Sequence, residues 1–204
     1  MKSSRDQVLA DLRTNAPPPT PLPELAGDWI AYDDPLAQFT AVLEGIGGRV
    51  RVVHGDEELR AAVAEVQQQV AAANTLSVAP AAPGNVDPAS LSDPHDLADI
   101  DLAVLTGDFA VAENGAVWVT DRQLPLRIAY FICQHLVLIV PAAAVVPTMH
   151  AAYDRLAAMH DGEGEFATPA FGCFVSGPSK TADIEQSLVI GAHGARSLTV
   201  LFTG

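Results

Sequence analysis

Apolar residues recur three or four positions apart in three parts of the chain, which is the spacing of a helix face buried against a core. These parts are residues 36–46, 59–70 and 149–156. The first is preceded by Asp34-Pro35, an acidic N-cap with proline in the first turn, and followed by Gly47-Gly48. We therefore predict a helix between these two signals and one helix in each of the other parts.

Short runs rich in Val, Ile, Leu and Phe lie between and after the helical segments, and they predict strands. The predicted strands cover residues 49–53, 75–79, 102–106, 109–112, 116–120, 136–140, 170–175, 188–190 and 198–202. Strands separated by crossover helices pair in parallel, whereas the closely spaced strands near residue 115 and at the C-terminus imply some antiparallel pairing. The pattern predicts an α/β fold, with a mainly parallel (mixed) sheet and helices on both faces.

The start of the chain differs in composition from the rest. Residues 8–12 have the pattern of a short amphipathic helix, and residues 17–23 read PPPTPLP, which cannot continue a helix. We predict a helical arm with a proline-rich linker over residues 1–24, which docks on a neighbour or frays, and a single α/β domain over residues 25–204. Acidic residues near the start argue against a signal peptide or membrane anchor.

Composition narrows the class of partner. The 204 residues are 49% hydrophobic and 18% charged, so the chain can bury a core, and the net charge is −14. Such a surface repels nucleic-acid backbones and anionic membranes on average. Two cysteines, Cys133 and Cys173, exclude a disulfide framework and a four-cysteine zinc or iron–sulfur site. We expect a cytoplasmic protein with two buried free thiols.

The first segment with candidate chemistry is the turn Glu113-Asn114-Gly115. Ligands of open α/β sheets gather in the loops after the carboxyl ends of strands, and this turn joins two predicted strands. Gly115 stands where a positive φ is needed, and it is counted with the candidate ligand-binding residues. A carboxylate held on such a turn suits a nucleophile or a general base, and the alternative is a solvated turn residue.

The second segment is the loop of residues 176–185, SGPSKTADIE, which follows a predicted strand. Its candidate ligand-binding residues are Ser176, Gly177, Ser179, Lys180, Thr181, Asp183 and Glu185. Hydroxyls, backbone N–H groups and one ammonium can together cradle a phosphate or a carboxylate. A nucleotide-binding P-loop is rejected, because lysine does not directly follow the second glycine. The alternative is a helix N-cap.

The third segment is the turn of residues 191–195, GAHGA, between the last two predicted strands. His193 could serve as a general acid or base, or hydrogen-bond to the preceding loop, and Gly194 is counted with the ligand-binding residues. The other histidines show no spacing typical of a metal site. They are His54, His95, His135, His150 and His160.

The segment of residues 176–204 resembles the C-terminal signature of the LUD domain, specifically of the lactate-utilization protein C family. The family core Gly-Pro-Ser-(Lys/Arg)-Thr-Ala-Asp-Ile-Glu matches residues 177–185. Its Gly-Val-His-Gly-Pro turn is similar to residues 191–195, with Ala195 in place of proline. Its Ala-Glu-Thr-Gly-Thr turn is similar to the segment around Glu113, with Asn114 in place of threonine.

This resemblance implies a fold type shared with class I CoA-transferases and sugar-phosphate isomerases. It also implies participation in bacterial oxidation of L-lactate to pyruvate, where three proteins act together and two resemble iron–sulfur proteins. Because this chain lacks the cysteines for a cluster, we expect no cofactor bound here and iron–sulfur clusters in the partners.

On this interpretation the chain binds a small anionic ligand through Lys180, Ser179 and Thr181. The two carboxylates of the loop orient the ammonium, and Glu113 and His193 act on the bound molecule. Two alternatives stay open. A stand-alone CoA-transferase-like or sugar-phosphate enzyme would use Glu113 as its nucleophile or base, since Glu-Asn-Gly resembles the class I CoA-transferases. In a pure scaffold, the motif loop would only shape the fold.

Overall fold

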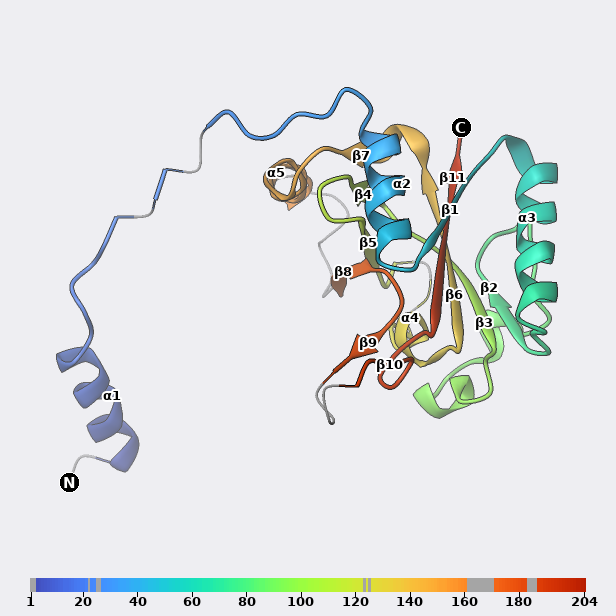
Figure 1. The fold of residues 1–204 in the computed structure, drawn as a ribbon. Helices are drawn as coiled ribbons and strands as arrows, with labels where there is room; N and C mark the ends of the chain where they lie inside the picture. Colours follow the sequence, from blue (N-terminus) through green and yellow to red (C-terminus); the bar gives the residue numbers. More distant parts are fainter. Residues whose placement is uncertain are drawn as a thin grey trace.

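The centre of the fold is a parallel sheet of five strands in the order β1-β11-β6-β3-β2 (Figure 1). The computed structural model describes residues 3–21, 23–24, 27–122, 124, 126–160, 171–182 and 187–204. The strands are β1 (Arg49–Val53), β2 (Thr75–Ser77), β3 (Leu102–Thr106), β6 (His135–Pro141) and β11 (Ser197–Thr203). The last strand of the chain therefore lies inside the sheet, between β1 and β6.

A second sheet of four strands has the order β7-β4-β5-β8. Its strands are β4 (Phe109–Val111), β5 (Ala116–Thr120), β7 (Val145–Val146) and β8 (Gly172–Ser176). The pairs β4–β5 and β5–β8 are antiparallel, whereas β4 and β7 are parallel. The antiparallel pairing predicted near residue 115 is thus confirmed, and it lies in a sheet of its own. Only Gly107 and Asp108 separate β3 from β4, too few for the crossover that a parallel neighbour requires.

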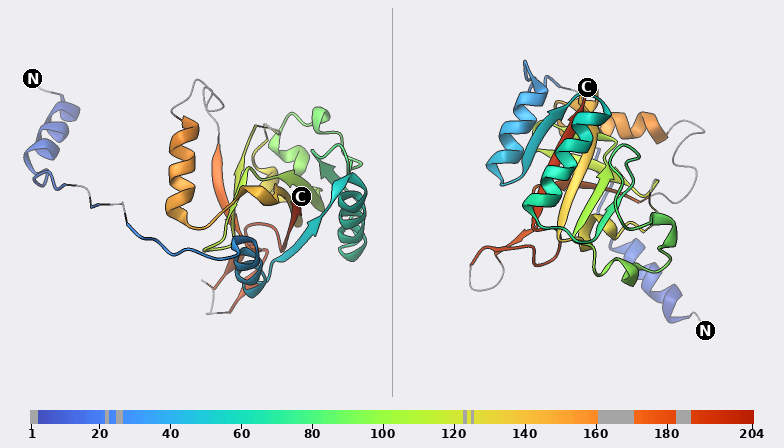
Figure 2. Two further views of the ribbon diagram at one scale, coloured as in Figure 1. Left: turned by 90° about the horizontal axis from the view of Figure 1, so that it is seen from above. Right: turned by 90° about the vertical axis from the view of Figure 1, so that its right-hand side faces the viewer.

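Helices and the second sheet complete the layers around the central sheet (Figure 2). One face packs against α3 (Gly55–Gln69), and the other against α2 (Pro35–Gly45), α4 (Ala129–Ile132) and the second sheet. Outside the second sheet lies α5 (Met149–His160). The predicted α/β class with a mainly parallel sheet is confirmed, although β-structure covers much of the second face. Short 3₁₀ turns are η1 (Pro88–Ser90), η2 (Pro94–Leu97) and η3 (Ala142–Ala144).

Local signals account for the first helix of the domain. The Asp34 side chain accepts a hydrogen bond from the Ala37 N–H, Pro35 occupies the first turn, and Gly47 after the helix has φ +89°. Both predicted ends of α2 are therefore confirmed. In contrast, α4 was not predicted, because a four-residue helix is too short to show a helical period.

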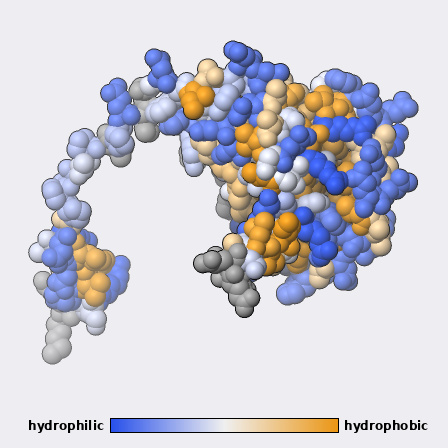
Figure 3. All heavy atoms as spheres, viewed as in Figure 1, coloured by the Kyte–Doolittle hydropathy of each residue, from blue (hydrophilic) through white to orange (hydrophobic). Residues whose placement is uncertain are grey.

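The N-terminal arm holds a helix, α1 (Ser4–Thr14), which starts at a capping box between Ser3 and Asp6. None of its residues is buried, and Figure 1 shows it beyond an extended segment, apart from the rest of the chain. Its apolar face is exposed at Val8 and Leu12 (Figure 3). The amphipathic helix is confirmed, while its docking on a neighbour stays a prediction. In the part of the chain described, no helix combines the length and apolar character needed to cross a bilayer.

Candidate functional site

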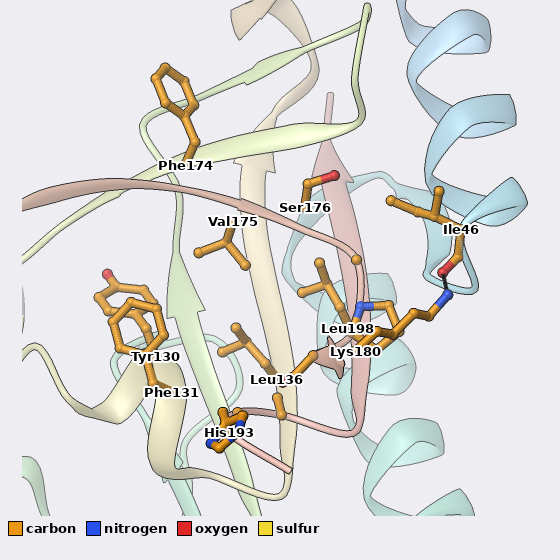
Figure 4. A pocket seen from close by; sticks show the side chains of 15 residues that line it. Ile46, Tyr130, Phe131, Leu136, Phe174, Val175, Ser176, Lys180, His193 and Leu198 are labelled. Atoms are coloured by element: carbon orange, nitrogen blue, oxygen red, sulfur yellow. Dashed lines mark hydrogen bonds between the residues drawn. The ribbon is translucent and has the colours of Figure 1, made fainter. Parts of the chain in front are cut away.

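A cavity of about 540 Å³ opens between the second sheet and the turn that leads into β11 (Figure 4). It is lined by Ile46, Tyr130, Phe131, Leu136, Phe174, Val175, Ser176, Gly177, Pro178, Ser179, Lys180, His193, Gly194, Ala195 and Leu198. The structure thus brings together two segments with predicted chemistry, the motif loop and the histidine turn.

The cavity lies at the amino edge of the central sheet. Leu136 and Leu198, which line it, are the second residues of β6 and β11. The motif loop follows the carboxyl end of β8 in the second sheet, as expected of a loop after a strand, yet the cavity that it lines lies at the amino edge of the central sheet. The reason is topological: β11 runs parallel to β1 and β6, so the chain must return to the amino edge before entering it. The described residues 177–182 and 187–196, which include the first part of the motif, belong to that return.

The return segment begins at a glycine whose conformation other residues rarely adopt. Gly177 has φ +70°, and a Cβ added there would lie 2.9 Å from Cδ1 of Ile46. Just before it, the Ser176 hydroxyl donates to the Asn114 carbonyl at 2.8 Å. The β8 strand end, the β4–β5 turn and the C-terminal end of α2 therefore meet at one corner of the cavity.

Ser179 connects the motif to the histidine turn through its backbone. Its N–H donates to the Ala195 carbonyl at 2.8 Å, and its own carbonyl accepts from the Gly191 N–H at 2.9 Å. The side chain lies against Gly194, where an added Cβ would be 3.2 Å from Ser179 Cβ. These contacts hold Ser179 next to the turn that carries His193, and both residues line the cavity.

Beyond Ser179 the chain forms a ribbon, in which β9 (Lys180–Thr181) pairs antiparallel with β10 (Val189–Ile190). No helix begins at Ser179 or Lys180, because β9 pairs with β10 there, while a helix capped by Thr181 or Asp183 would fall on residues 183–186, outside the described residues. Two predicted site residues, Asp183 and Glu185, lie outside the described residues. Their proposed orientation of the lysine stays a prediction.

Lys180 reaches back to the C-terminal end of α2. Its Nζ donates to the carbonyl of Ile46, the residue that caps the helix (Figure 4). A cation is favoured there, since the carbonyls at a helix C-terminus carry partial negative charge. The ammonium is exposed at the rim of the cavity, and its contact with a ligand stays a prediction.

The rim and the interior of the cavity differ in polarity. Ser176, Lys180 and His193 are exposed, while Leu136 and Leu198 are buried at its base. Of the described residues that line it, none is a carboxylate, and Lys180 and His193 are those that can carry positive charge. In a chain of net charge −14, this is a local reversal of sign.

Tyr130 contributes its ring to the cavity. Its hydroxyl donates to the Thr120 carbonyl at 2.8 Å, inside the protein. Burial, and secondarily the negative charges of Asp108 and Asp121, raise the pKa of Tyr130. The phenol therefore stays protonated and serves packing, since its proton is engaged with a backbone carbonyl.

Glu113 is not among the residues that line the cavity. Its carboxylate accepts a hydrogen bond of 2.8 Å from the N–H of Met149, the first residue of α5, and its own N–H donates to the Pro147 carbonyl. A negative charge at a helix N-terminus is stabilising. The positive φ predicted for Gly115 is confirmed at +63°. A catalytic role for Glu113 stays a prediction.

Sequence reasoning missed the apolar walls of the cavity. These residues are Ile46, Tyr130, Phe131, Leu136, Phe174, Val175, Pro178, Ala195 and Leu198. In the sequence Leu136, Phe174, Val175 and Leu198 belong to apolar runs that predict core strands. No pattern distinguishes a core side chain from one facing a cavity, so only their nearness to the motif could have indicated them.

A second, polar cavity at the same edge holds His135. Its Nδ1 lies 2.7 Å from the Ser197 hydroxyl. Desolvation, followed by the positive charge of Arg196, lowers the pKa of His135. Among the described residues, no group of three or more His, Cys, Asp or Glu side chains is placed to hold a metal ion.

The lowered pKa of His135 predicts a pH-dependent stability. The unfolded chain gains this proton as the pH falls through about 6.5, whereas the folded protein gains it only at a lower pH. The stability that comes from keeping His135 neutral is therefore fully present above the pKa of the unfolded chain. It is lost as the pH falls towards the lower pKa of the folded protein. Between pH 8 and pH 5.5, the free energy of unfolding measured with urea should fall less for His135→Gln than for the wild type. The exposed His54→Gln control should behave like the wild type, and equal losses in all three would refute the assignment.

The fold and the motif-bearing rim together define an α/β protein of the LUD type. A family model described as the LUD domain matches residues 92–203. Because this match covers more than half of the chain, the protein belongs to the LUD domain family. The predicted family membership is confirmed.

Curated relatives named lactate utilization protein C are similar to part of this chain. The protein from Oceanobacillus iheyensis is 31% identical over 102 residues, which are 50% of this chain and 42% of that protein. The protein from Bacillus pumilus is 36% identical over 92 residues, which are 45% of this chain and 38% of that protein. The matched part thus spans about two-fifths of the length of these relatives.

A solved structure supports the fold. The crystal structure of a DUF162 family protein from Deinococcus radiodurans has a TM-score of 0.60 and 17% sequence identity to this chain. The superposition covers 83% of this chain and 96% of that chain. Likeness at this identity concerns the fold alone.

Proposed function

We propose that this protein is a cytoplasmic component of a bacterial system that oxidises L-lactate to pyruvate, and that it acts with iron–sulfur partner proteins. Its own part is to bind a small anionic ligand at the cavity rim. Family membership and the names of the relatives favour this role. The match spans only part of those relatives, so their names alone do not give this chain its role.

The observation that carries the proposal is the charge of the rim. Lys180 and His193 lie there with the Ser179 hydroxyl, and no described lining residue is a carboxylate. An ammonium and hydroxyl donors bind a carboxylate through charge-assisted hydrogen bonds. The acidic remainder of the surface would meanwhile discourage polyanions.

The cysteines favour placing the redox groups in partners. Burial raises the pKa of the Cys133 thiol to about 12, so it stays protonated and is a poor metal ligand. Burial also raises the pKa of Cys173. A chain with these two cysteines cannot hold a four-cysteine cluster, and we propose that the electrons of lactate pass to clusters in the partners.

The proposal is tested by removing the rim ammonium. We expect Lys180→Met to abolish complementation of lactate-dependent growth. We also expect the variant to need about tenfold more L-lactate than the wild type for the same rise in melting temperature. Arg51→Met is the matched control, because it removes an exposed cation on β1 whose partner is Glu65, outside the cavity. Unchanged growth and unchanged ligand response in Lys180→Met would refute the site.

The alternative, an enzyme with Glu113 as nucleophile, predicts a different outcome. If Glu113 only caps α5, Glu113→Ala lowers the free energy of unfolding by about 0.5–2 kcal/mol, and Glu113→Gln, which keeps an acceptor oxygen, lowers it less. Urea unfolding measures both values. Incubation with acetyl-CoA followed by hydroxylamine should then leave residue 113 unmodified. A covalent adduct on Glu113 would instead favour the enzyme.

A further inference from the structure

The interior of the cavity is apolar over most of its surface. Leu136 from β6 is 2% exposed and Leu198 from β11 is 1% exposed, and Val175 from β8 points into the same space (Figure 4). The ionisable side chains Lys180 and His193 lie at the edges of this space. A ligand that fills the cavity must therefore bury an apolar body and keep its charged group at the rim.

The size of the cavity exceeds the needs of a three-carbon acid. About 540 Å³ falls within the range of roughly 300–1,000 Å³ that holds drug-sized ligands. A small carboxylate at the rim would leave the base around Leu136 and Leu198 without contacts. Since unfilled apolar surface contributes nothing to affinity, the shape indicates a larger ligand.

Aromatic rings form one side of the cavity. Tyr130 and Phe131 both line it, and the Phe131 ring contacts that of Phe171 edge to face, with centroids 6.1 Å apart at 87°. The Tyr130 hydroxyl is bonded to the Thr120 carbonyl, so the cavity receives the apolar ring rather than the hydroxyl. Rings held in fixed orientation favour a flat ring, which stacks on a face or meets an edge, over a flexible chain.

We propose that the cavity binds an anionic ligand whose buried part is a planar aromatic ring system, with its acidic group near Lys180 and His193. The inference rests on the proposed function, because it assigns the body of the ligand to the cavity whose rim holds the anion. Phe131 and Val175 set the specificity for the ring, and Lys180 attracts the acid.

Calorimetric titration with 2-naphthoate tests this inference, with octanoate as an acid of flexible apolar body. We expect 2-naphthoate to bind the full chain at least fivefold more tightly than octanoate. Phe131→Ala, which removes the ring wall, and Val175→Phe, which fills the space, should each weaken 2-naphthoate binding tenfold or more. Val52→Phe places the same side chain on an exposed position of β1 and should leave binding unchanged.

Two results would overturn the inference. One is the absence of heat with 2-naphthoate at millimolar concentration, and the other is unchanged binding in Phe131→Ala together with Val175→Phe, both checked for folding by thermal melting. A thermal shift with L-lactate and complementation of growth are measured separately. If these persist while 2-naphthoate fails, the ring specificity is refuted and the proposed function stands. If 2-naphthoate binds while both lactate assays fail, the cavity assignment stands and the lactate role is refuted.

Discussion

Phe202→Ala should lower the free energy of unfolding by about 3–5 kcal/mol, the range observed for removing a buried phenylalanine ring. Phe202 is 0% exposed and lies in β11, the strand between β1 and β6. Its ring meets that of Phe39 in α2 edge to face, with centroids 5.1 Å apart at 87°. The substitution leaves a void between the central sheet and α2, and close-packed neighbours can fill it only in part.

Urea unfolding followed by circular dichroism measures this loss. Val52→Ala is a stringent control, because Val52 pairs directly with Phe202 across β1 and β11 but is 41% exposed. We expect it to change stability by less than about 0.5–1 kcal/mol. A loss under about 1 kcal/mol for Phe202→Ala would mean that α2 does not depend on this contact.

Gly177→Val should disrupt the motif rim while the central sheet remains folded. A β-branched residue strongly disfavours φ near +70°, and its Cβ would meet the Ile46 side chain at 2.9 Å. A left-handed non-glycine residue costs about 1–3 kcal/mol, with more for a branched side chain. The return segment therefore shifts, and its contacts between Ser179 and the histidine turn loosen.

Amide hydrogen exchange gives the direct readout of this change. The Ser179 N–H, which donates to Ala195, should lose protection in Gly177→Val, while amides of β6 and β11 stay protected. Lactate-dependent growth should fall to the level of the Lys180→Met variant. Gly45→Ala is the control, since an added Cβ there meets nothing within 4 Å. Retained Ser179 protection would contradict the structural role of Gly177.

Much of the secondary structure could be predicted from the sequence, because it depends on neighbours along the chain. The helix α2 follows from its apolar period and its caps, and the positive φ of Gly115 follows from the Glu-Asn-Gly turn. In the ribbon, the apolar run at residues 188–190 predicts β10, whereas β9 consists of only Lys180 and Thr181 and shows no strand period. The tertiary structure alone decides that these two residues pair with β10.

The candidate site was predictable in its residue types more than in its assembly. The motif loop and the His193 turn do meet at one cavity, as their shared chemistry suggests. Glu113, chosen for the same kind of reason, instead places its carboxylate on the first N–H of α5. A carboxylate on a turn suits both roles, and no local pattern reports which N–H group lies nearby.

By itself the sequence determined the α/β class, the positions of most elements and the family, since each depends on periodicity or on a contiguous motif. Only the tertiary structure decided that β11 enters the middle of the sheet and that the motif lies at its amino edge. It also decided that Leu136, Val175 and Leu198 face one cavity. These features depend on strand order and on contacts between distant segments, which a linear pattern of apolar residues does not specify.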